Sequence, residues 1–330
     1  MKSREIIGKL RVCAKNLLDV ARELQAMDRA ESLRTEDLIE KVVASSEGGA
    51  RKFDLPFVLG QNDFGEDTIV ELARLPHLLI GGASGRGKTV CLNSLLAGLI
   101  RTKTPKDVRF IIYDPKCVEF GWANGLPHLA TSVISDASRM VQTLRWLVFE
   151  MERRLKMFAR AYCRNIAEFN TRSGIGACPA DMPKAAPYIV VVIDELVDLM
   201  LAHGEEVVEQ ITRITATGRA AGIHLVVATS RPDCMVASGL LKANIPGRLA
   251  FRTLSSIDSR AVIDDVGAEL LNGRGDFIFR NGSEEIVRGQ GAHISAETMT
   301  KLAEDAKRKY GKPDYSMCKI DEDAMVPKEA

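Results

Sequence analysis

Residues 78–89 read LLIGGASGRGKT, an apolar run that passes directly into a glycine-rich loop and then into a helical pattern. The last eight of these residues fit the pattern G-x-x-x-x-G-K-[ST] without a mismatch. Glycines let the backbone curl so that consecutive N–H groups point at phosphate, and the following helix presents its positive end to the same place. The stretch therefore predicts a phosphate-binding loop between a strand and a helix.

The residues of this loop have separate expected roles in binding ATP and Mg²⁺. Lys88 is expected to reach the β- and γ-phosphates, and it is predicted to be a catalytic residue as well. The Thr89 hydroxyl is expected to bind Mg²⁺. The residues predicted to bind the nucleotide are Gly82, Ala83, Ser84, Gly85, Arg86, Gly87, Lys88 and Thr89.

A second chemical element is the run YIVVVIDE at residues 188–195, which reads as a buried strand ending in two carboxylates. Asp194 is expected to bind Mg²⁺ through water, and Glu195 to polarise the attacking water. Acidic residues also cap helices at strand ends. The phosphate-binding loop upstream favours the catalytic interpretation, and a water-activating group distinguishes an ATP hydrolase from a P-loop kinase.

Polar residues follow other predicted strands. Ser230 lies after the run 224–228, where a sensor of the γ-phosphate is expected at the same sheet edge. Asp114 and Lys116 follow the run 110–113, and a local ion pair or turn explains them as well as a direct role does. Arg219 ends a predicted helix, where it could cap its own carbonyls or reach the ATP of a neighbouring subunit. The residue pattern alone leaves both roles of Arg219 open.

Strand-like runs alternate with helical patterns from residue 53 onward, which predicts an α/β fold with a mostly parallel sheet. The long helix expected at 139–162 has an apolar stripe assigned to the core, and its arginines are assigned to solvent or an interface. The strands are predicted at 78–81, 110–113, 189–193, 224–228, 247–251 and 275–279, and the helices at 89–101, 137–162, 207–221 and 259–263.

Three regions are predicted along the chain. Residues 1–52 read as a helical segment and linker, with one helix beginning near Ile6 and a second over 35–44 that has Thr35 as its N-cap. Residues 53–300 form the α/β domain. Residues 301–330 read as a final helix and a flexible tail.

Composition excludes several classes of protein. The 330 residues are 46% hydrophobic and 27% charged, as in ordinary globular proteins, and the net charge is +1. The apolar runs are too short to span a bilayer and no signal peptide is evident, so a cytoplasmic protein is expected. None of the seven cysteines has C-x-x-C spacing, which predicts free thiols rather than a zinc or redox site.

Several blocks in a fixed order make the chain resemble the FtsK/SpoIIIE family of DNA translocases. They extend over roughly residues 55 to 293. The blocks are residues 75–80, 114–116, 125–129, 150–154, 194–195, 219–225, 228–232, 242–246 and 257–260.

This resemblance implies a RecA-like P-loop NTPase domain, a homo-hexameric ring and ATP-driven movement along double-stranded DNA. It makes Arg219 the leading candidate for an arginine finger acting in a neighbouring subunit, and it places Lys242 in a pore loop that approaches DNA. Ser230 stands where the family usually has Gln, and Ser256 where it usually has Lys. The family's membrane-spanning region and C-terminal winged-helix module are not found, so a motor serving a plasmid, phage or integrated element is expected.

Two other functions remain as alternatives. One is a conjugative coupling or secretion ATPase of the same superfamily, which moves single-stranded DNA or protein. The other is a regulatory nucleotide-binding protein without turnover. Glu195 argues against the second, because binding alone needs no water activator.

Overall fold

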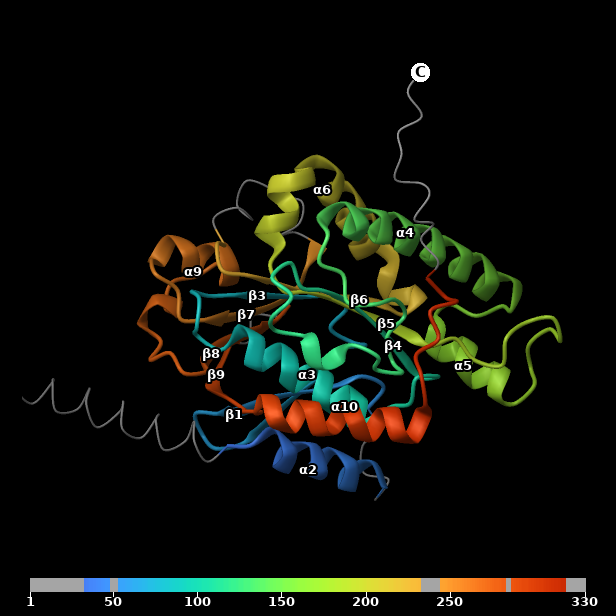
Figure 1. Ribbon diagram of the computed structural model, residues 1–330, viewed down its shortest axis with the longest axis horizontal. Coiled ribbons are helices and arrows are strands. Elements are labelled where there is room, and N and C mark those ends of the chain that lie inside the picture. Colours follow the sequence, from blue (N-terminus) through green and yellow to red (C-terminus); the bar gives the residue numbers. More distant parts are fainter. Residues whose placement is uncertain (1–32, 48–52, 233–243, 283–285, 319–330) are drawn as a thin grey trace, which may run out of the picture.

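A nine-stranded sheet covered by helices on both faces forms the centre of the molecule in the computed structural model (Figure 1). The structure describes residues 33–47, 53–232, 244–282 and 286–318. The strands are β1 (Pro56–Asn62), β2 (Asp67–Glu71), β3 (Leu78–Gly81), β4 (Val108–Tyr113), β5 (Tyr188–Ile193), β6 (Ile223–Thr229), β7 (Gly247–Phe251), β8 (Asp276–Asn281) and β9 (Ile286–Gly291).

The sheet has a parallel half and an antiparallel half. Its strand order is β2-β1-β9-β8-β7-β3-β6-β5-β4. The five strands from β7 to β4 run parallel to their neighbours. The strands from β2 to β8 are antiparallel, and β8 joins β7 in the same way. The expectation of a mostly parallel sheet therefore needs correction, because it holds only for the half that contains the glycine-rich loop.

Helices form a layer on each face of this sheet. In Figure 1, α2, α3 and α10 lie on one face, and α4 and α6 lie on the other. The helices are α2 (Thr35–Glu47), α3 (Lys88–Thr102), η1 (Gly121–Ala123), α4 (Ala137–Arg160), α5 (Ile166–Gly174), α6 (Leu196–Ala221), α9 (Ser256–Ile263), η2 (Ala268–Leu270) and α10 (Ala296–Tyr310).

Side chains alternate along the central strands and divide the core into two main clusters. Leu78 and Ile80 of β3 belong to the cluster under α2, α3 and α10. Leu79, between them, belongs to the cluster under α4 and α6. This alternation follows from the two-residue period of a strand. It also explains why the parallel strands read as continuous apolar runs, since both faces are buried.

All six strands predicted from the apolar runs are present, with small differences at their ends. Strands β1, β2 and β9 were not predicted from the sequence, and they make up most of the antiparallel half. Gly60 bulges β1 against β2, and β9 carries Gly289 and Gly291 with two thirds of its residues exposed or partly exposed. Such strands lack the apolar run by which the others were found.

The helices differ more from expectation. The expected helix over 35–44 extends to Glu47, and Thr35 is its first residue rather than an N-cap, since its hydroxyl donates to Ser94. The structure adds α5 and the first part of α6, where the non-helical backbone of His203 kinks the helix. The helix expected near Ile6 lies outside the described residues.

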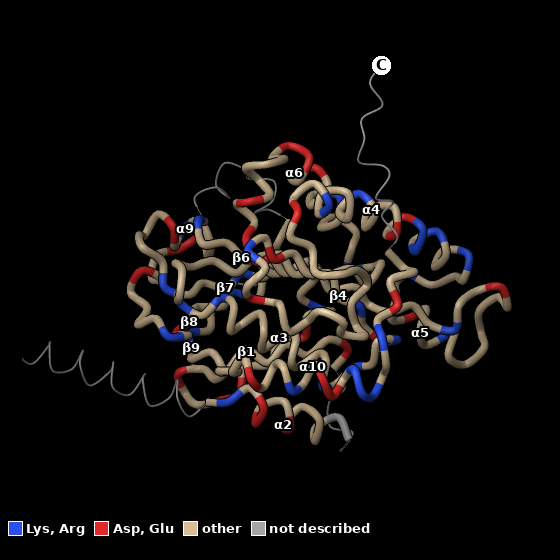
Figure 2. Tube along the Cα trace, viewed as in Figure 1, with Lys and Arg blue, Asp and Glu red and all other residues tan. Residues whose placement is uncertain are grey.

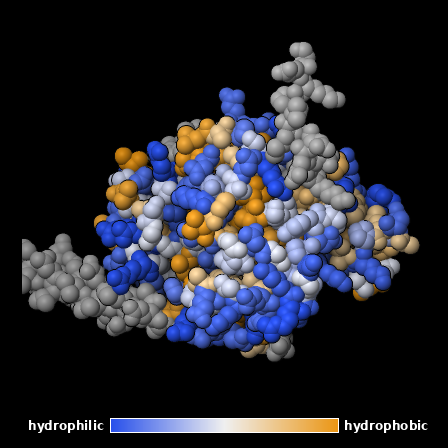
Figure 3. All heavy atoms as spheres, in the orientation of Figure 1, coloured by the Kyte–Doolittle hydropathy of each residue, from blue (hydrophilic) through white to orange (hydrophobic). Residues whose placement is uncertain are grey.

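Basic and acidic residues are interspersed along the chain in the helical layers, and the net charge is +1 (Figure 2). Exposed apolar side chains gather over α9 and the first part of α6 (Figure 3). They include Leu201, Leu254, Ile257 and Leu270. No helix within the described ranges has the length and apolar character needed to cross a membrane.

Candidate nucleotide site

The carboxyl ends of three neighbouring parallel strands place the predicted site residues at one edge of the sheet. Gly81 at the end of β3 pairs with Thr229 of β6, and Ile193 at the end of β5 pairs with Val227 of β6. The glycine-rich loop, the Asp194–Glu195 pair and Ser230 begin directly after these strands. This edge is where open α/β sheets bind their ligands.

Two glycines of the loop have conformations and neighbours that a side chain would disturb. Gly82 and Gly87 have φ angles of 151° and 119°. A Cβ on Gly82 would lie 2.9 Å from the Cβ of Phe251, and one on Gly87 would lie 3.2 Å from the Cα of Gly275. Gly87 is also the N-cap of α3, so no side chain covers the free amides of the first helical turn. Those amides are suited to phosphate.

Lys88 is nearly buried at the base of the loop. Its Nζ donates to the carbonyl oxygens of Gly82 and Ala83 at 2.7 and 3.1 Å. Burial lowers the pKa of Lys88, whereas the nearby charges of Glu195 and Asp194 act in the opposite direction. The loop therefore holds an ammonium group beside the two carboxylates, where a phosphate would complete its hydrogen bonds.

Asp194 has an environment that favours a cation. Burial, together with the charges of Asp114, Glu119 and Glu195, raises the pKa of its carboxyl to about 6. The described residues contain no group of three or more His, Cys, Asp or Glu that could hold a metal alone. Mg²⁺ is usually bound by one or two protein oxygens together with substrate phosphates and water. Asp194 and Thr89 therefore fit a magnesium ion that arrives with a nucleotide.

Asp114 organises a turn, which answers the question that the sequence left open. Its fully buried carboxylate accepts hydrogen bonds from the backbone amides of Lys116, Glu119 and Phe120 at 3.0 to 3.2 Å. Among the described residues, the structure records no ion pair between Asp114 and the Lys116 side chain. Asp114 acts on the site indirectly, by adding negative charge beside Asp194.

Glu195 is buried, and among the described residues its hydrogen bonds all come from Ser230. The Ser230 amide lies 3.1 Å from both carboxylate oxygens, and the Ser230 hydroxyl donates to Oε2 at 2.5 Å. Ser230 is thus bound to the predicted water-activating group. The sequence suggested a γ-phosphate sensor at this position but gave no sign of this contact.

A cavity of about 280 Å³ opens beside the glycine-rich loop. Gly85 and Gly87 form one side, and Val90 and Phe251 supply apolar walls. Residues from the antiparallel half complete the lining, namely Arg274, Gly275, Gly291, Ala292 and His293. Sequence reasoning missed them because they belong to strands and turns without a recognisable motif.

Arg219 lies at the opposite edge of the sheet from the glycine-rich loop. It ends α6 just before β6 begins, whereas Ser230 follows the end of β6. The seven residues of β6 span about 23 Å. Arg219 lines a separate pocket with two more arginines, Arg74 and Arg164. This placement separates Arg219 from the phosphate-binding loop of its own chain.

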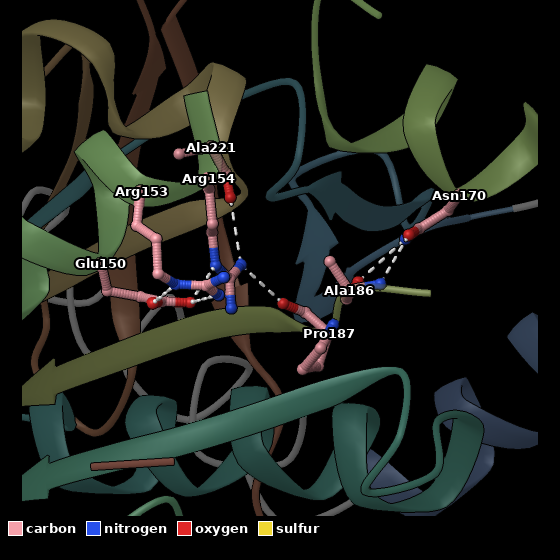
Figure 4. Close-up of polar contacts among 7 residues, drawn as sticks. All are labelled: Glu150, Arg153, Arg154, Asn170, Ala186, Pro187 and Ala221. Atoms are coloured by element: carbon pink, nitrogen blue, oxygen red, sulfur yellow. Dashed lines mark hydrogen bonds and ion pairs between the residues drawn. The ribbon is translucent and has the colours of Figure 1, made fainter. Parts of the chain in front are cut away.

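Arg154 of α4 corrects the expectation that the arginines of this helix face solvent or an interface. Its side chain is 1% exposed and donates to Glu150 Oε1 at 2.7 Å. It also donates to the carbonyls of Pro187 and Ala221, which precede β5 and end α6 (Figure 4). Arg154 therefore joins three elements and fixes the helix end that carries Arg219.

Lys242, the predicted DNA contact, lies outside the described residues. Ser256, the second departure from the family pattern, is the first residue of α9 and follows Ser255, whose side chain caps that helix.

Comparisons with known proteins agree with this geometry. The sequence pattern of the FtsK/SpoIIIE family matches residues 39–234. The chain is 40% identical to the DNA translocase FtsK of Haemophilus influenzae over 296 residues, and 43% identical to the DNA translocase SftA of Bacillus subtilis over 258 residues. These matches cover 84% and 78% of this chain but only 56% and 27% of the relatives.

A solved structure has the same architecture. The pCW3 conjugation coupling protein TcpA, determined as a monomer with ATPγS, matches with a TM-score of 0.65 and 27% identity. The match covers 77% of this chain and 71% of that protein. The P-loop ATPase fold therefore extends over most of the chain.

Proposed function

Because the chain belongs to the FtsK/SpoIIIE family, we propose that it hydrolyses ATP to move double-stranded DNA through a ring of copies of itself. The relatives named DNA translocases support this activity. The observation that carries the proposal is the position of Glu195. Its carboxylate is buried near Lys88, and its negative charge opposes the lowering of the Lys88 pKa by burial. A protein that only bound nucleotide would need no such group.

The residues of the site divide the work of hydrolysis. Lys88 and the amides of the glycine-rich loop would hold the phosphates, and Glu195 would orient and deprotonate the attacking water. Asp194 and Thr89 would hold Mg²⁺, which neutralises charge on the phosphate oxygens when it is bound. The solved structure of TcpA with ATPγS supports nucleotide binding in this fold.

The cavity beside the loop fits the base of ATP. Its volume of about 280 Å³ is near the lower end of the range for small-molecule sites. Phe251 and Val90 offer apolar surface to a flat ring, and Arg274 and His293 offer polar groups at its rim. The antiparallel half of the sheet would thus bind the base, while the parallel half binds the phosphates.

A ring of identical chains requires two different surfaces that fit each other. The glycine-rich loop and Arg219 lie at opposite edges of the sheet, as a head-to-tail contact requires. Arg219 would then complete the ATP site of the next subunit. The exposed apolar side chains over α9 and α6 support burial against a partner. A homo-hexamer in the cytoplasm is our working assembly.

DNA contacts should go to phosphates, because a motor that moves over any sequence can use only what all duplexes share. The net charge of +1 leaves few basic residues for this task. Lys242 is the proposed contact.

The alternative is a coupling or secretion ATPase that moves single-stranded DNA or protein, and the likeness to TcpA favours it over other rivals.

The test measures ATP hydrolysis with no polymer, duplex DNA, single-stranded DNA and RNA. We expect duplex DNA to stimulate most, and Lys242→Ala to reduce that stimulation while basal hydrolysis stays nearly intact. Glu195→Gln should lower hydrolysis by about 100-fold or more. Stimulation by single-stranded DNA alone would reject the duplex substrate, and near-normal hydrolysis by Glu195→Gln would reject its role.

A further inference from the structure

Ser230 supplies all the hydrogen bonds that the structure records for the Glu195 carboxylate within the described residues. The Ser230 amide is 3.1 Å from Oε1 and 3.1 Å from Oε2, so it is shared between them. The Ser230 hydroxyl adds a short bond of 2.5 Å to Oε2. Since the Glu195 side chain is only 7% exposed, few other donors can reach it.

The contact follows from the register of two strands. Ile193 of β5 pairs with Val227 of β6, so Glu195 and Ser230 lie just beyond neighbouring strand ends. Thr229 Oγ1 accepts the amide of Arg231 at 3.1 Å, which turns the chain after β6. The turn directs the Ser230 amide and hydroxyl together to the end of β5.

The two carboxylate oxygens of Glu195 accept different numbers of hydrogen bonds. Each oxygen of an ionised carboxylate can accept about two hydrogen bonds. Oε2 accepts from both the Ser230 amide and the Ser230 hydroxyl, which fills its capacity. Within the part of the chain that the structure describes, Oε1 accepts only the shared amide, which leaves it an acceptor site. A water that donates a proton to Glu195 would meet Oε1.

We propose that Ser230 is a positioning residue for ATP hydrolysis, whose hydroxyl occupies Oε2 of Glu195 and so presents Oε1 to the attacking water. This inference rests on the proposed function, because it concerns the same carboxylate. It gives Ser230 a role different from that of a group that touches the γ-phosphate.

The two roles of Ser230 differ in what they change. Ser230 also lines a pocket with Ala83 of the glycine-rich loop, so a direct contact with nucleotide is the competing explanation. Loss of a nucleotide contact raises the KM for ATP. Loss of a hydroxyl that orients Glu195 lowers kcat with little change in KM, since the water is held less well only in the transition state.

The experiment compares three substitutions in the full chain. Ser230→Ala removes the hydroxyl, Ser230→Cys replaces it by a weak donor of similar shape, and Ser230→Thr retains it. We expect kcat to fall about tenfold in the first two, with KM within about twofold, because a charge-assisted hydrogen bond is lost. Ser230→Thr should stay within about threefold of the wild type. Ser173→Ala removes an exposed hydroxyl bonded to the Pro183 carbonyl, and it should change neither constant.

A double substitution separates positioning from a structural role. In single-turnover hydrolysis, adding Ser230→Ala to Glu195→Gln should cause no further loss if the hydroxyl acts through Glu195. A further tenfold loss in the double variant, or a raised KM with unchanged kcat in Ser230→Ala, would overturn the proposal. If Glu195→Gln itself hydrolysed ATP normally, the catalytic role proposed for Glu195 would fail as well. Normal kcat in both Ser230→Ala and Ser230→Cys with an inactive Glu195→Gln would reject only the positioning role.

Discussion

Asp194 has a pKa of about 6 because burial and the charges of Asp114, Glu119 and Glu195 disfavour its ionised form. Mg²⁺ needs the ionised carboxylate, so protons and the metal compete for it. The carboxyl is mostly ionised above pH 6 and mostly protonated below it. Metal binding in the presence of nucleotide should therefore weaken with acid at an unusually high pH for an aspartate.

The expected result is a tenfold weaker apparent affinity for Mg²⁺ for about each pH unit below 6, and little change above it. Titration of Mg²⁺ with a fluorescent, non-hydrolysable ATP analogue measures this. Asp194→Asn should bind Mg²⁺ more weakly, and its remaining pH dependence gives the contribution of the nucleotide's own protonation. Equal slopes for wild type and Asp194→Asn would contradict the role of Asp194.

Single residues with a motif could be predicted from the sequence, whereas their mutual contacts could not. The loop at 82–89 and the pair Asp194–Glu195 were found because short patterns define them. The hydrogen bonds between Ser230 and Glu195 depend on the register of β5 against β6, which no local pattern fixes. For the same reason, the sequence left Asp114 between a turn and a direct role.

At the scale of elements, Arg154 holds α4 to the end of α6 and the start of β5. Its partner Glu150 also accepts from Arg153 at 2.7 and 2.9 Å, so one buried carboxylate serves two guanidinium groups (Figure 4). Burial raises the pKa of Glu150, but these two arginines outweigh it, and the net pKa is lowered. Glu150 thus stays charged and depends on its partners.

Arg154→Met should lower the free energy of unfolding by about 3–5 kcal/mol, because it leaves a buried charge and two carbonyls with fewer partners. Urea unfolding measures the change. Arg213→Met is the matched control, since Arg213 also joins α6 to α4 through Glu152 but both side chains are 48% exposed. That pair should contribute about 1 kcal/mol or less. Similar losses of unfolding free energy in the two variants would show that burial does not increase the contribution of Arg154 to stability.

The elements that escaped sequence analysis share a physical cause. Parallel strands buried on both faces leave an apolar run, and β3 to β7 were recognised by it. Strand β9 joins only Gly289, Gln290 and Gly291 to β1, and it offers no such run. Arg154 was assigned to the surface because charged residues are seldom buried unless they are paired. The spacing of Glu150 and Arg154 by four residues allows their pairing, but the burial of Arg154 against the carbonyls of Pro187 and Ala221 is visible only in the fold.

At the scale of the whole molecule, Arg219 and the glycine-rich loop lie at opposite edges of the sheet. If Arg219 completes a neighbour's site, Arg219→Ala should bind ATP normally and fail to hydrolyse it. Mixed with Lys88→Ala subunits, it should recover part of the activity, because some interfaces then combine an intact loop with an intact arginine. Steady-state hydrolysis of defined mixtures measures this.

Co-assembly of the two variants has to be shown separately, by pulling down one tagged chain with the other. Mixed rings without any recovery would reject a role for Arg219 in the neighbouring subunit. An arginine acting within its own chain gives no recovery, since each intact loop would then belong to a chain that lacks the arginine.

The pairing of β1 with β9 has a consequence for how the chain is made. Gly60 of β1 pairs with Gly291, which lies about 230 residues later in the chain. Strand β3 lies between β6 and β7, which also follow it much later in the chain. A ribosome adds about 5–20 residues each second, so the emerging chain waits on the order of 10 to 50 seconds before its first strand can join the sheet. During that interval the apolar strands are exposed to the cell's chaperones, and a stop codon placed before residue 286 leaves β1 and β8 with open edges. Truncated products should therefore aggregate or be degraded rather than accumulate as partly folded chains.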